Sequence, residues 1–212
     1  MHLPHDVPSP IDLRLPHDAA DWERTANIKR PWRSQFFQCF SDEIGHHHGT
    51  TRVLELGSGP GFLAAHLLAE HSRLRMVLLD FSSAMHSLAR NRLAPFLDRV
   101  SFVERDFREP GWFESIGMFD FVVTHQAVHE VRHKRHVPTL HAQVRAVLAP
   151  QGQYLVCDHY VGEDGMGDGD LYMTVEEQRQ ALVAADYKAV LELKRKGGLV
   201  LHSANLAPWE DL

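Results

Sequence analysis

Residues 53–61 read VLELGSGPG, a short apolar stretch that runs directly into a glycine-rich loop. The apolar part, residues 53–56, is typical of a buried strand, and residues 62–70 after the loop have the pattern of a helix. Glycines allow the backbone to turn tightly and to approach a ligand closely. In open α/β sheets ligands bind at the carboxyl ends of strands, so this loop predicts a ligand site.

The same alternation of short apolar and longer amphipathic segments continues along the chain. Strands are expected at residues 76–79, 100–104, 119–124 and 153–157, and helices at residues 83–93, 138–148 and 175–185. Residues 189–194 and 199–203 flank two glycines and suggest a terminal hairpin. Because strands joined through helices pair in parallel, we predict a Rossmann-like, doubly wound, mostly parallel sheet with helices on both faces.

The N-terminal part differs from this pattern. The first 20 residues contain four prolines and are expected to be extended, whereas residues 21–44 look helical with a break near Pro31. We therefore predict that residues 1–50 form a lead-in and lid helices, and that residues 51–212 form the core of a single domain.

Composition limits the function classes. The 212 residues are 44% hydrophobic and carry a net charge of −6, which argues against binding nucleic acid or a membrane through bulk charge. Two cysteines and the absence of an apolar stretch of about 20 residues favour a cytoplasmic protein without a membrane segment. We expect a small-molecule partner, no nucleic acid, no membrane, and a monomer or homodimer.

Two acidic residues follow the next strands. Asp80 comes after the second strand, about 20 residues beyond the loop, where a carboxylate accepts hydrogen bonds from ribose hydroxyls, and Asp106 comes after the third. The dinucleotide fingerprint requires a third glycine where Phe62 stands, and the lysine of a phosphate-binding P-loop is missing.

Taken in order, these motifs resemble those of class I S-adenosylmethionine-dependent methyltransferases of the small-molecule type. The resemblance covers residues 52–205, and LAPQG at residues 148–152 is similar to a turn of that family, with Gln151 in place of a glycine. It implies S-adenosylmethionine as the cofactor and a seven-stranded sheet whose last strand is antiparallel, which suits the terminal hairpin.

The resemblance also implies the cofactor site. The glycine loop would hold the methionine part, the second motif the ribose and adenine, and the residue after the third strand the adenine amino group. The end of the fourth strand would touch the cofactor near the reacting methyl group, and Arg30 or Arg33 would meet the cofactor carboxylate. The residues at these positions are Glu55, Gly57, Ser58, Gly59, Gly61, Asp80, Phe81, Met85, Asp106, Phe107, Thr124, His125, Gln126 and Arg33.

The 16 histidines raise the question of a metal. Residues 129–133 read HEVRH, the spacing of a zinc hydrolase motif, but the segment follows a strand end rather than lying on a clear helix. We predict no metal, and we expect most histidines to lie in turns or in the lead-in, with His46, His47 and His48 in a surface turn.

His129 falls where relatives place a histidine facing the substrate. It is predicted as the catalytic residue, a general base, with a structural or substrate-shaping role as the equal alternative. The other residues expected near the substrate are Trp22, His159 and Tyr160, and residues 162–170 are expected to form a mobile loop that orders on binding.

The predicted function is therefore methyl transfer to an N, O, C or S atom of a small metabolite. The proline-rich motif of amino-methylating nucleic-acid enzymes is missing, and Thr124-His125 replace the metal-binding aspartate of catechol-type enzymes. An RNA or protein methyltransferase and a non-catalytic S-adenosylmethionine-binding regulatory protein remain the alternatives.

Overall fold

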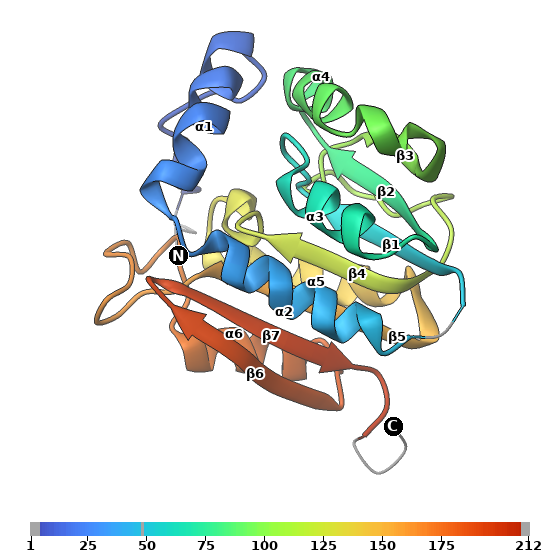
Figure 1. The fold of residues 1–212 in the computed structure, drawn as a ribbon. Helices are drawn as coiled ribbons and strands as arrows, with labels where there is room; N and C mark the ends of the chain where they lie inside the picture. The colour runs from blue at the N-terminus through green and yellow to red at the C-terminus, as the bar shows by residue number, and fades with distance from the viewer. Residues whose placement is uncertain (1–4, 48, 209–212) are drawn as a thin grey trace.

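A seven-stranded sheet forms the centre of the computed structural model, which describes residues 5–47 and 49–208 (Figure 1). His48 and residues 1–4 of the lead-in lie outside the described residues. The strand order is β3-β2-β1-β4-β5-β7-β6. The strands are β1 (Thr51–Leu56), β2 (Leu74–Asp80), β3 (Val100–Glu104), β4 (Phe119–His125), β5 (Leu148–His159), β6 (Ala189–Lys196) and β7 (Leu199–Asn205).

Strand directions match the predicted sheet. β1 pairs in parallel with β2 and β4, and the pairs β2–β3 and β4–β5 are also parallel. β7 is antiparallel to both β5 and β6, so the terminal hairpin inserts its second strand into the sheet. The prediction of a doubly wound, mostly parallel sheet with an antiparallel last strand is confirmed.

Helices cover both faces of the sheet. The α-helices are α1 (Pro16–Lys29), α2 (Arg33–Gly45), α3 (Phe62–Glu70), α4 (Ser83–Arg92), α5 (Val137–Arg145) and α6 (Val175–Ala184). Three 3-10 helices are η1 (Ala94–Arg99), η2 (Val128–Val131) and η3 (Lys134–His136). Apolar residues of α2, α3 and α4 form one core cluster with the sheet, and those of α5 and α6 form the other. Adjacent residues Val53 and Leu54 of β1 belong to different clusters, as the alternation of side chains along a strand requires.

The extended lead-in is shorter than expected. α1 begins at Pro16 rather than near residue 21, because proline at the first helical position loses no hydrogen bond and its φ already suits a helix. Its end is set by Pro31, which disfavours helical geometry at Arg30, and Arg30 has φ −138° and ψ 72°. The predicted break between the two N-terminal helices is confirmed.

The boundary between α5 and β5 also differs from the expectation. α5 ends at Arg145 rather than at residue 148, and β5 begins at Leu148 instead of Gln153. The pairing of β5 with β4 is irregular between Phe119 and Phe121, where the partner shifts from Leu148 to Gln153. This irregularity accommodates the LAPQG turn at the start of the strand.

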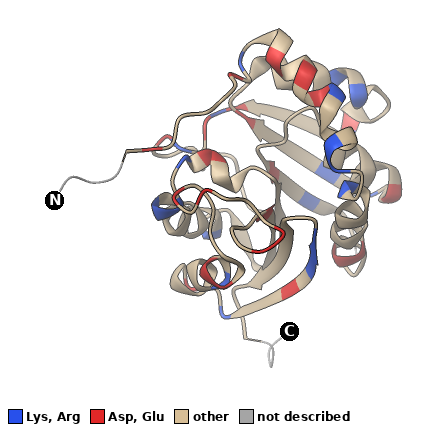
Figure 2. Cartoon of the chain, turned by 90° about the vertical axis from the view of Figure 1, so that its left-hand side faces the viewer, with Lys and Arg blue, Asp and Glu red and all other residues tan. Residues whose placement is uncertain are grey.

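The two edges of the sheet are short or interrupted. β3 forms one edge, and β6, which pairs only with β7, forms the other and contains a register shift between Glu192 and Lys194. Acidic and basic residues are interspersed over helices and loops (Figure 2). Within residues 5–47 and 49–208, none of the helices combines the length and apolar character that crossing a membrane requires.

Candidate active site

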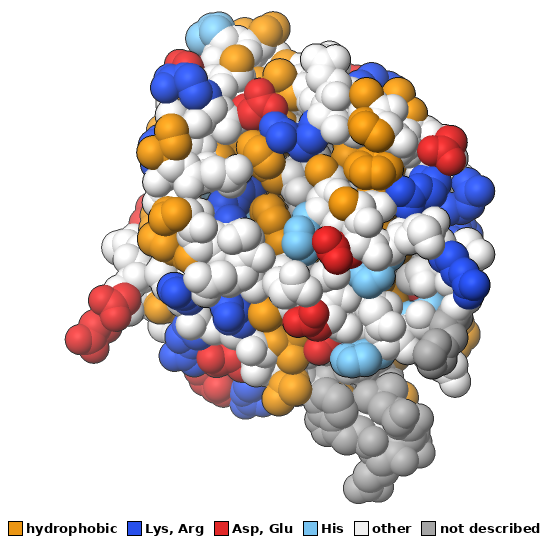
Figure 3. All heavy atoms as spheres, viewed as in Figure 1, with side chains coloured by type: hydrophobic (Ala, Val, Ile, Leu, Met, Phe, Trp, Pro, Cys, Tyr) orange, Lys and Arg blue, Asp and Glu red, His pale blue; other side chains and the backbone are white. Residues whose placement is uncertain are grey.

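A cavity of about 560 Å³ opens at the carboxyl ends of β1, β2, β4 and β5. Its wall is completed by α1, by the start of α2 and by the N-terminal segment, which we define as residues 6–14. On this face a hollow lies between α1 and the rest of the molecule, and hydrophobic and basic side chains gather around it (Figure 3). The glycine loop and the strand ends therefore meet in one cavity, as the sequence predicts.

The glycine loop adopts backbone geometry that other residues rarely take. Gly57 has φ +64°, and a Cβ atom there would lie 2.4 Å from the Cβ of Ala127. Gly59 has φ +53°, but nothing lies within 4 Å of the position of its missing Cβ, so the loop presents bare backbone to open space. The loop is thus held against the segment after β4 and leaves room for a ligand to approach closely.

Asp80 fixes the loop to the end of β2. Its carboxylate accepts the backbone N–H of Gly59 at 2.8 Å and that of Ser82 at 2.9 Å. Burial raises the pKa of Asp80 to about 6, although these hydrogen bonds act in the opposite direction. Each carboxylate oxygen has a further lone pair, so Asp80 can still accept a ligand hydroxyl.

Glu55 and Arg33 bring two buried ionisable side chains to the same cavity. One carboxylate oxygen of Glu55 and the Nε of Arg33 have no hydrogen-bond partner among the described residues. Burial raises the pKa of Glu55 well above its usual range and lowers that of Arg33 to about 10. The Arg33 guanidinium lies 5.3 Å from the Trp22 ring and 5.2 Å from the Phe62 ring. An acid and a base left unsatisfied in this way fit the ammonium and carboxylate groups of an amino acid.

Aromatic residues line the cavity beyond Asp80. Phe81 and Phe107 lie between this cavity and a neighbouring one, into which Asp106 faces. Arg108 binds Asp106 through Nε, at 2.9 and 3.1 Å, and through Nη2. Burial opposes ionisation of Asp106, but these bonds lower its pKa. The carboxylate expected to meet the adenine amino group is thus already held by an arginine.

The end of β4 carries the second group of predicted residues. The His125 ring is buried against Phe36, Phe37 and Phe40, and burial lowers its pKa well below the usual value. Gln126 has a left-handed backbone with φ +61°, and its N–H donates to the Cys157 carbonyl at 2.8 Å. Strain of this kind at a cavity wall is common at binding sites.

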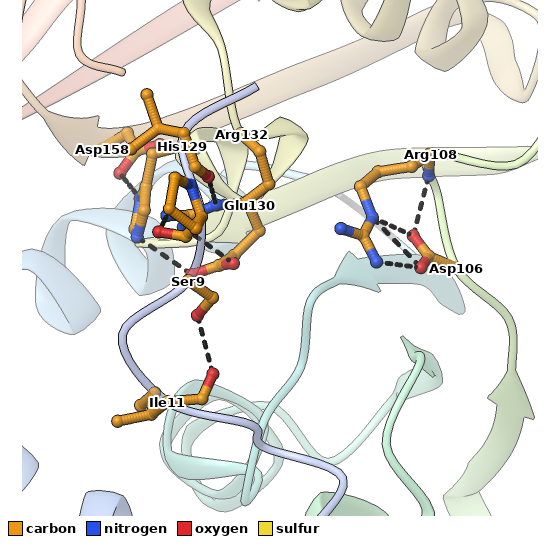
Figure 4. A network of polar contacts seen from close by, with 10 residues as sticks. Ser9, Ile11, Asp106, Arg108, His129, Glu130, Arg132 and Asp158 are labelled. Carbon is orange, nitrogen blue, oxygen red and sulfur yellow. Dashed lines mark hydrogen bonds and ion pairs between the residues drawn. The ribbon is translucent and has the colours of Figure 1, made fainter. Parts of the chain in front are cut away.

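His129 forms a close pair with Asp158 at the end of β5 (Figure 4). Its Nδ1 lies 2.7 Å from Asp158, its backbone N–H donates to the same carboxylate at 2.6 Å, and its Nε2 lies 3.4 Å from Glu130. Burial would lower the pKa of His129, but the two carboxylates outweigh it and raise that pKa to about 10. The two carboxylates thus favour the imidazolium form of His129.

His159 and Tyr172 complete this end of the cavity. The Gln126 amide lies 3.0 Å from His159 Nε2, and burial lowers the pKa of His159 to about 3, so its ring is neutral. The Tyr172 ring lies 5.4 Å from that of His129 and 5.6 Å from that of His159. We call His129, Asp158, His159 and Tyr172 the histidine end, and Glu55, Gly57, Gly59, Asp80 and Arg33 the glycine-loop end.

The N-terminal segment closes over the cavity through Arg132 (Figure 4). Arg132 is buried and donates to the carbonyls of Val7 and Pro8 at 2.9 Å each, while the Val7 N–H donates to the Arg132 carbonyl at 2.7 Å. Further along, the Ser82 hydroxyl donates to the Leu13 carbonyl at 2.5 Å. The segment is thereby attached to both sides of the cavity.

Most of the residues predicted from the sequence lie together. The predicted residues that line the cavity are Glu55, Gly57, Ser58, Gly59, Asp80, Phe81, Met85, Phe107, His125, Gln126, Arg33, Trp22, His129 and His159. Of the others, Asp106 faces the neighbouring cavity, Thr124 is buried, Gly61 precedes α3, and Tyr160 lines a separate surface groove. Their proposed contacts with the cofactor or substrate stay predictions.

The sequence did not point to three residues of the cavity or its network, which are Asp158, Arg132 and Tyr172, whereas Arg30, the alternative to Arg33 for the cofactor carboxylate, lines the cavity as well. Asp158 lies at the end of a strand, and the rule that selected Asp80 would have found it. Arg132 and Tyr172 follow no such rule, because loops bring them to the site.

The HEVRH segment does not form the zinc-hydrolase helix. Residues 128–131 and 134–136 are separate 3-10 helices, and His129 is bound to Asp158. Across residues 5–47 and 49–208, no group of three or more His, Cys, Asp or Glu is arranged to hold a metal. The expectation that most histidines lie in turns or the lead-in is wrong. Nine of the 16 lie inside regular elements: His17, His66, His86, His125, His141, His159 and His202 in α-helices or strands, and His129 and His136 in 3-10 helices.

Comparisons with known proteins agree with this architecture. Residues 53–152 match the profile of a family described as a methyltransferase domain. A highly reducing polyketide synthase, ALT1 of Alternaria alternata, is 35% identical over 124 residues, which are 53% of this chain and 4% of that protein. The carbon methyltransferase CurJ has a TM-score of 0.75 at 12% identity, covering 93% of this chain and 61% of the other. PigF, solved with SAH, has a TM-score of 0.71 at 16% identity, covering 90% and 59%.

The chain spans less than two thirds of the length of each of these proteins. Residues 53–152 carry the family match, and the fold is that of class I methyltransferases. The resemblance stated from the sequence motifs is confirmed.

Proposed function

We propose that this chain, with its class I methyltransferase fold, transfers a methyl group from S-adenosylmethionine to a small-molecule acceptor and releases S-adenosylhomocysteine. The observation that carries the proposal is a pair of buried side chains, Glu55 and Arg33, each with one polar atom left without a partner, beside the open backbone of Gly59. These residues suit the methionine part of the cofactor, and the carboxylate of Asp80 suits its ribose.

When bound, S-adenosylmethionine supplies a methyl group on a sulfonium sulfur. The residues of the chain then have two tasks, which are to align the acceptor atom with that methyl group and to exclude water. The N-terminal segment and α1 cover the cavity, which supports the proposal that residues 1–50 serve as a lid for a core formed by residues 51–212.

We propose that His129 faces the acceptor. With Nδ1 on Asp158 and a raised pKa, His129 at neutral pH is suited to donate a hydrogen bond from Nε2 rather than to accept a proton. A general base of this kind would act only at high pH or after Glu130 has moved away from Nε2.

A small-molecule acceptor is supported by the size of the cavity, about 560 Å³, and by the net charge of −6. Basic residues occur in short separate groups rather than in a continuous track. A cytoplasmic location, a monomeric or homodimeric state and the absence of a nucleic-acid or membrane partner stay predictions.

Calorimetry with S-adenosylhomocysteine tests the cofactor assignment. We expect binding by the wild-type protein, no detectable binding by Gly59→Arg, whose side chain would fill the open space, and weaker binding by Asp80→Ala. Gly49→Arg is the matched control, because Gly49 also has positive φ and open space but does not line the cavity. If Gly59→Arg and Asp80→Ala both bind as tightly as Gly49→Arg, the assignment is wrong.

A further inference from the structure

Arg30 is a charged residue of the cavity that the cofactor assignment does not use. It terminates α1, because Pro31 keeps it out of the helical conformation, and it lines the cavity in a partly buried position. Its backbone N–H donates to the Ala26 carbonyl, but no described residue forms a hydrogen bond or ion pair with its guanidinium. A partly buried guanidinium without a direct partner can bind an anion from outside the chain.

Arg30 and Arg33 both line the cavity, close enough for their charges to interact, but they have different neighbours. Arg33 stacks near Phe62 at the start of α3, and its charge interacts with Glu55 at the glycine-loop end. The charge of Arg30 acts on Tyr172, Asp158 and His159 at the histidine end, and it also repels the charge of Arg33. Of these two arginines, three residues apart, Arg33 lies beside Phe62 at the glycine-loop end, whereas Arg30 is the one whose charge acts on His159 and Tyr172.

The carboxylates near Arg30 are already satisfied. Asp158 accepts the backbone N–H and Nδ1 of His129 and the backbone N–H of His159. Glu130 pairs with Arg132 at 3.2 Å and with His129.

Asp168 also lines the cavity, but it is exposed and its Oδ1 accepts the backbone N–H groups of Asp170 and Leu171. The histidine end thus offers a cation without offering it a partner.

We propose that the methyl acceptor carries a carboxylate and that Arg30 binds this carboxylate, placing the acceptor beside His129. The guanidinium presents parallel N–H groups that match the two oxygens of a carboxylate, which fixes the orientation of a small molecule as well as its affinity. This inference rests on the proposed function, because the other end of the same cavity must hold the cofactor.

The experiment has two stages so that the two proposals fail separately. The first stage titrates S-adenosylhomocysteine alone into the wild-type protein, Arg30→Gln and Arg24→Gln. Arg24 is the matched control, since it is an exposed arginine of the same helix that pairs with Asp21 and does not line the cavity. We expect the three affinities to agree within about two-fold, because Arg33 rather than Arg30 serves the cofactor. Absence of wild-type binding would refute the proposed function, whereas a loss confined to Arg30→Gln would refute the division between the arginines.

The second stage offers acid and amide pairs to the protein saturated with S-adenosylhomocysteine. The probes are 4-hydroxybenzoate with 4-hydroxybenzamide, salicylate with salicylamide, and acetoacetate with acetoacetamide. We expect at least one acid to bind, its amide to bind about 10–100-fold more weakly, and Arg30→Gln to lose a similar factor for the acid while Arg24→Gln does not. Labelled methyl transfer from S-adenosylmethionine to the same probes should follow the same order.

Three outcomes would overturn the proposal. The first is equal binding of acid and amide, the second is undiminished acid binding by Arg30→Gln, and the third is that none of the acids binds the saturated protein. Arg30→Lys, which retains the charge without the paired N–H groups, should keep part of the preference for acids over amides.

Discussion

The glycine-loop end and the histidine end of the cavity are built in opposite ways. At the glycine-loop end, residues close in sequence or on adjacent strands interact, and burial raises the pKa values of its two carboxyls. At the histidine end, segments far apart in the chain meet, and a buried carboxylate is ionised because it pairs with a histidine. The glycine-loop end is a backbone loop fixed by local contacts, while the histidine end is a network of polar side chains positioned by the packing of distant segments.

The largest effect is expected from Gly57→Val. A side chain there would overlap Ala127 and would require a β-branched residue at φ +64°, so the loop must move. We expect S-adenosylhomocysteine affinity to fall by more than about 100-fold, measured by calorimetry, with a loss of stability of about 1–3 kcal/mol. Gly49→Val, at a positive φ with open space, controls for backbone strain alone. If Gly57→Val bound S-adenosylhomocysteine as tightly as the wild-type protein, the glycine loop would not be rigid.

Asp158→Asn separates the two ends. This change leaves the shape of the site but removes the charge that holds His129, so the pKa of His129 should fall from about 10 toward its ordinary value. We expect methyl transfer to a substrate found by screening to fall by about 10–100-fold, while S-adenosylhomocysteine affinity changes by less than about two-fold. NMR titration of the imidazole reports the pKa, and an equal loss of cofactor affinity would show that the two ends are one unit.

Arg132→Gln tests how the N-terminal segment is held at the histidine end. Loss of the guanidinium removes two hydrogen bonds to the carbonyls of Val7 and Pro8. Amides of residues 7–14 should exchange about 10-fold faster with solvent, as measured by hydrogen–deuterium exchange. Arg145→Gln, which removes a surface pair with Asp186, is the control. Unchanged exchange would place the attachment at Ser82 and Leu13 instead.

The stability of the fold should depend on pH, because buried histidines and the two carboxyls of the glycine-loop end contribute with opposite sign. Folding lowers the pKa values of His141 and His159 to about 3 and that of His202 to about 4, so the unfolded chain binds more protons and stability falls as pH drops below about 6.5. The raised pKa values of Glu55 and Asp80 oppose this loss, because the folded state then binds protons that the unfolded carboxyls release.

His129 acts on the alkaline side. Its contribution is complete below about pH 6.5 and is lost as the pH rises through about 10. Urea unfolding between pH 5 and 10 should therefore show a maximum near neutral pH, with a slope of about 1.4 kcal/mol per pH unit for each net proton. His129→Gln should flatten the alkaline side and His202→Gln the acidic side. A wild-type profile without a maximum would contradict the assignment of buried neutral histidines.

The glycine-loop end could be predicted because its chemistry is local. The strand, the loop and Asp80 follow one another along the chain, and the rule that ligands bind at strand ends turns that order into a site. The sheet could be predicted for the same reason, since strands and helices alternate with clear apolar patterns. Errors in the fold were confined to element ends, as at Pro16 and Leu148.

The histidine end was only partly predictable. His129 and His159 were identified, but the Asp158 contact spans 29 residues, and the contacts of Arg132 with the N-terminal segment span 124 and 125. No local pattern signals such contacts, which depend on how loops pack after the sheet has formed. The free guanidinium of Arg30 is similar, because a missing partner is visible only once all neighbouring residues are placed.

The open edge of the sheet at β6 has a consequence for solution behaviour rather than chemistry. An exposed strand edge can pair with the edge of another molecule and start aggregation. The register shift between Glu192 and Lys194 interrupts the regular ladder, and Lys194, Arg195 and Lys196 follow it at the end of the strand. A second copy that paired through the same edge would meet an irregular backbone, and the basic side chains of the two copies would repel each other. Both features of β6 oppose the formation of fibres through edge-to-edge pairing.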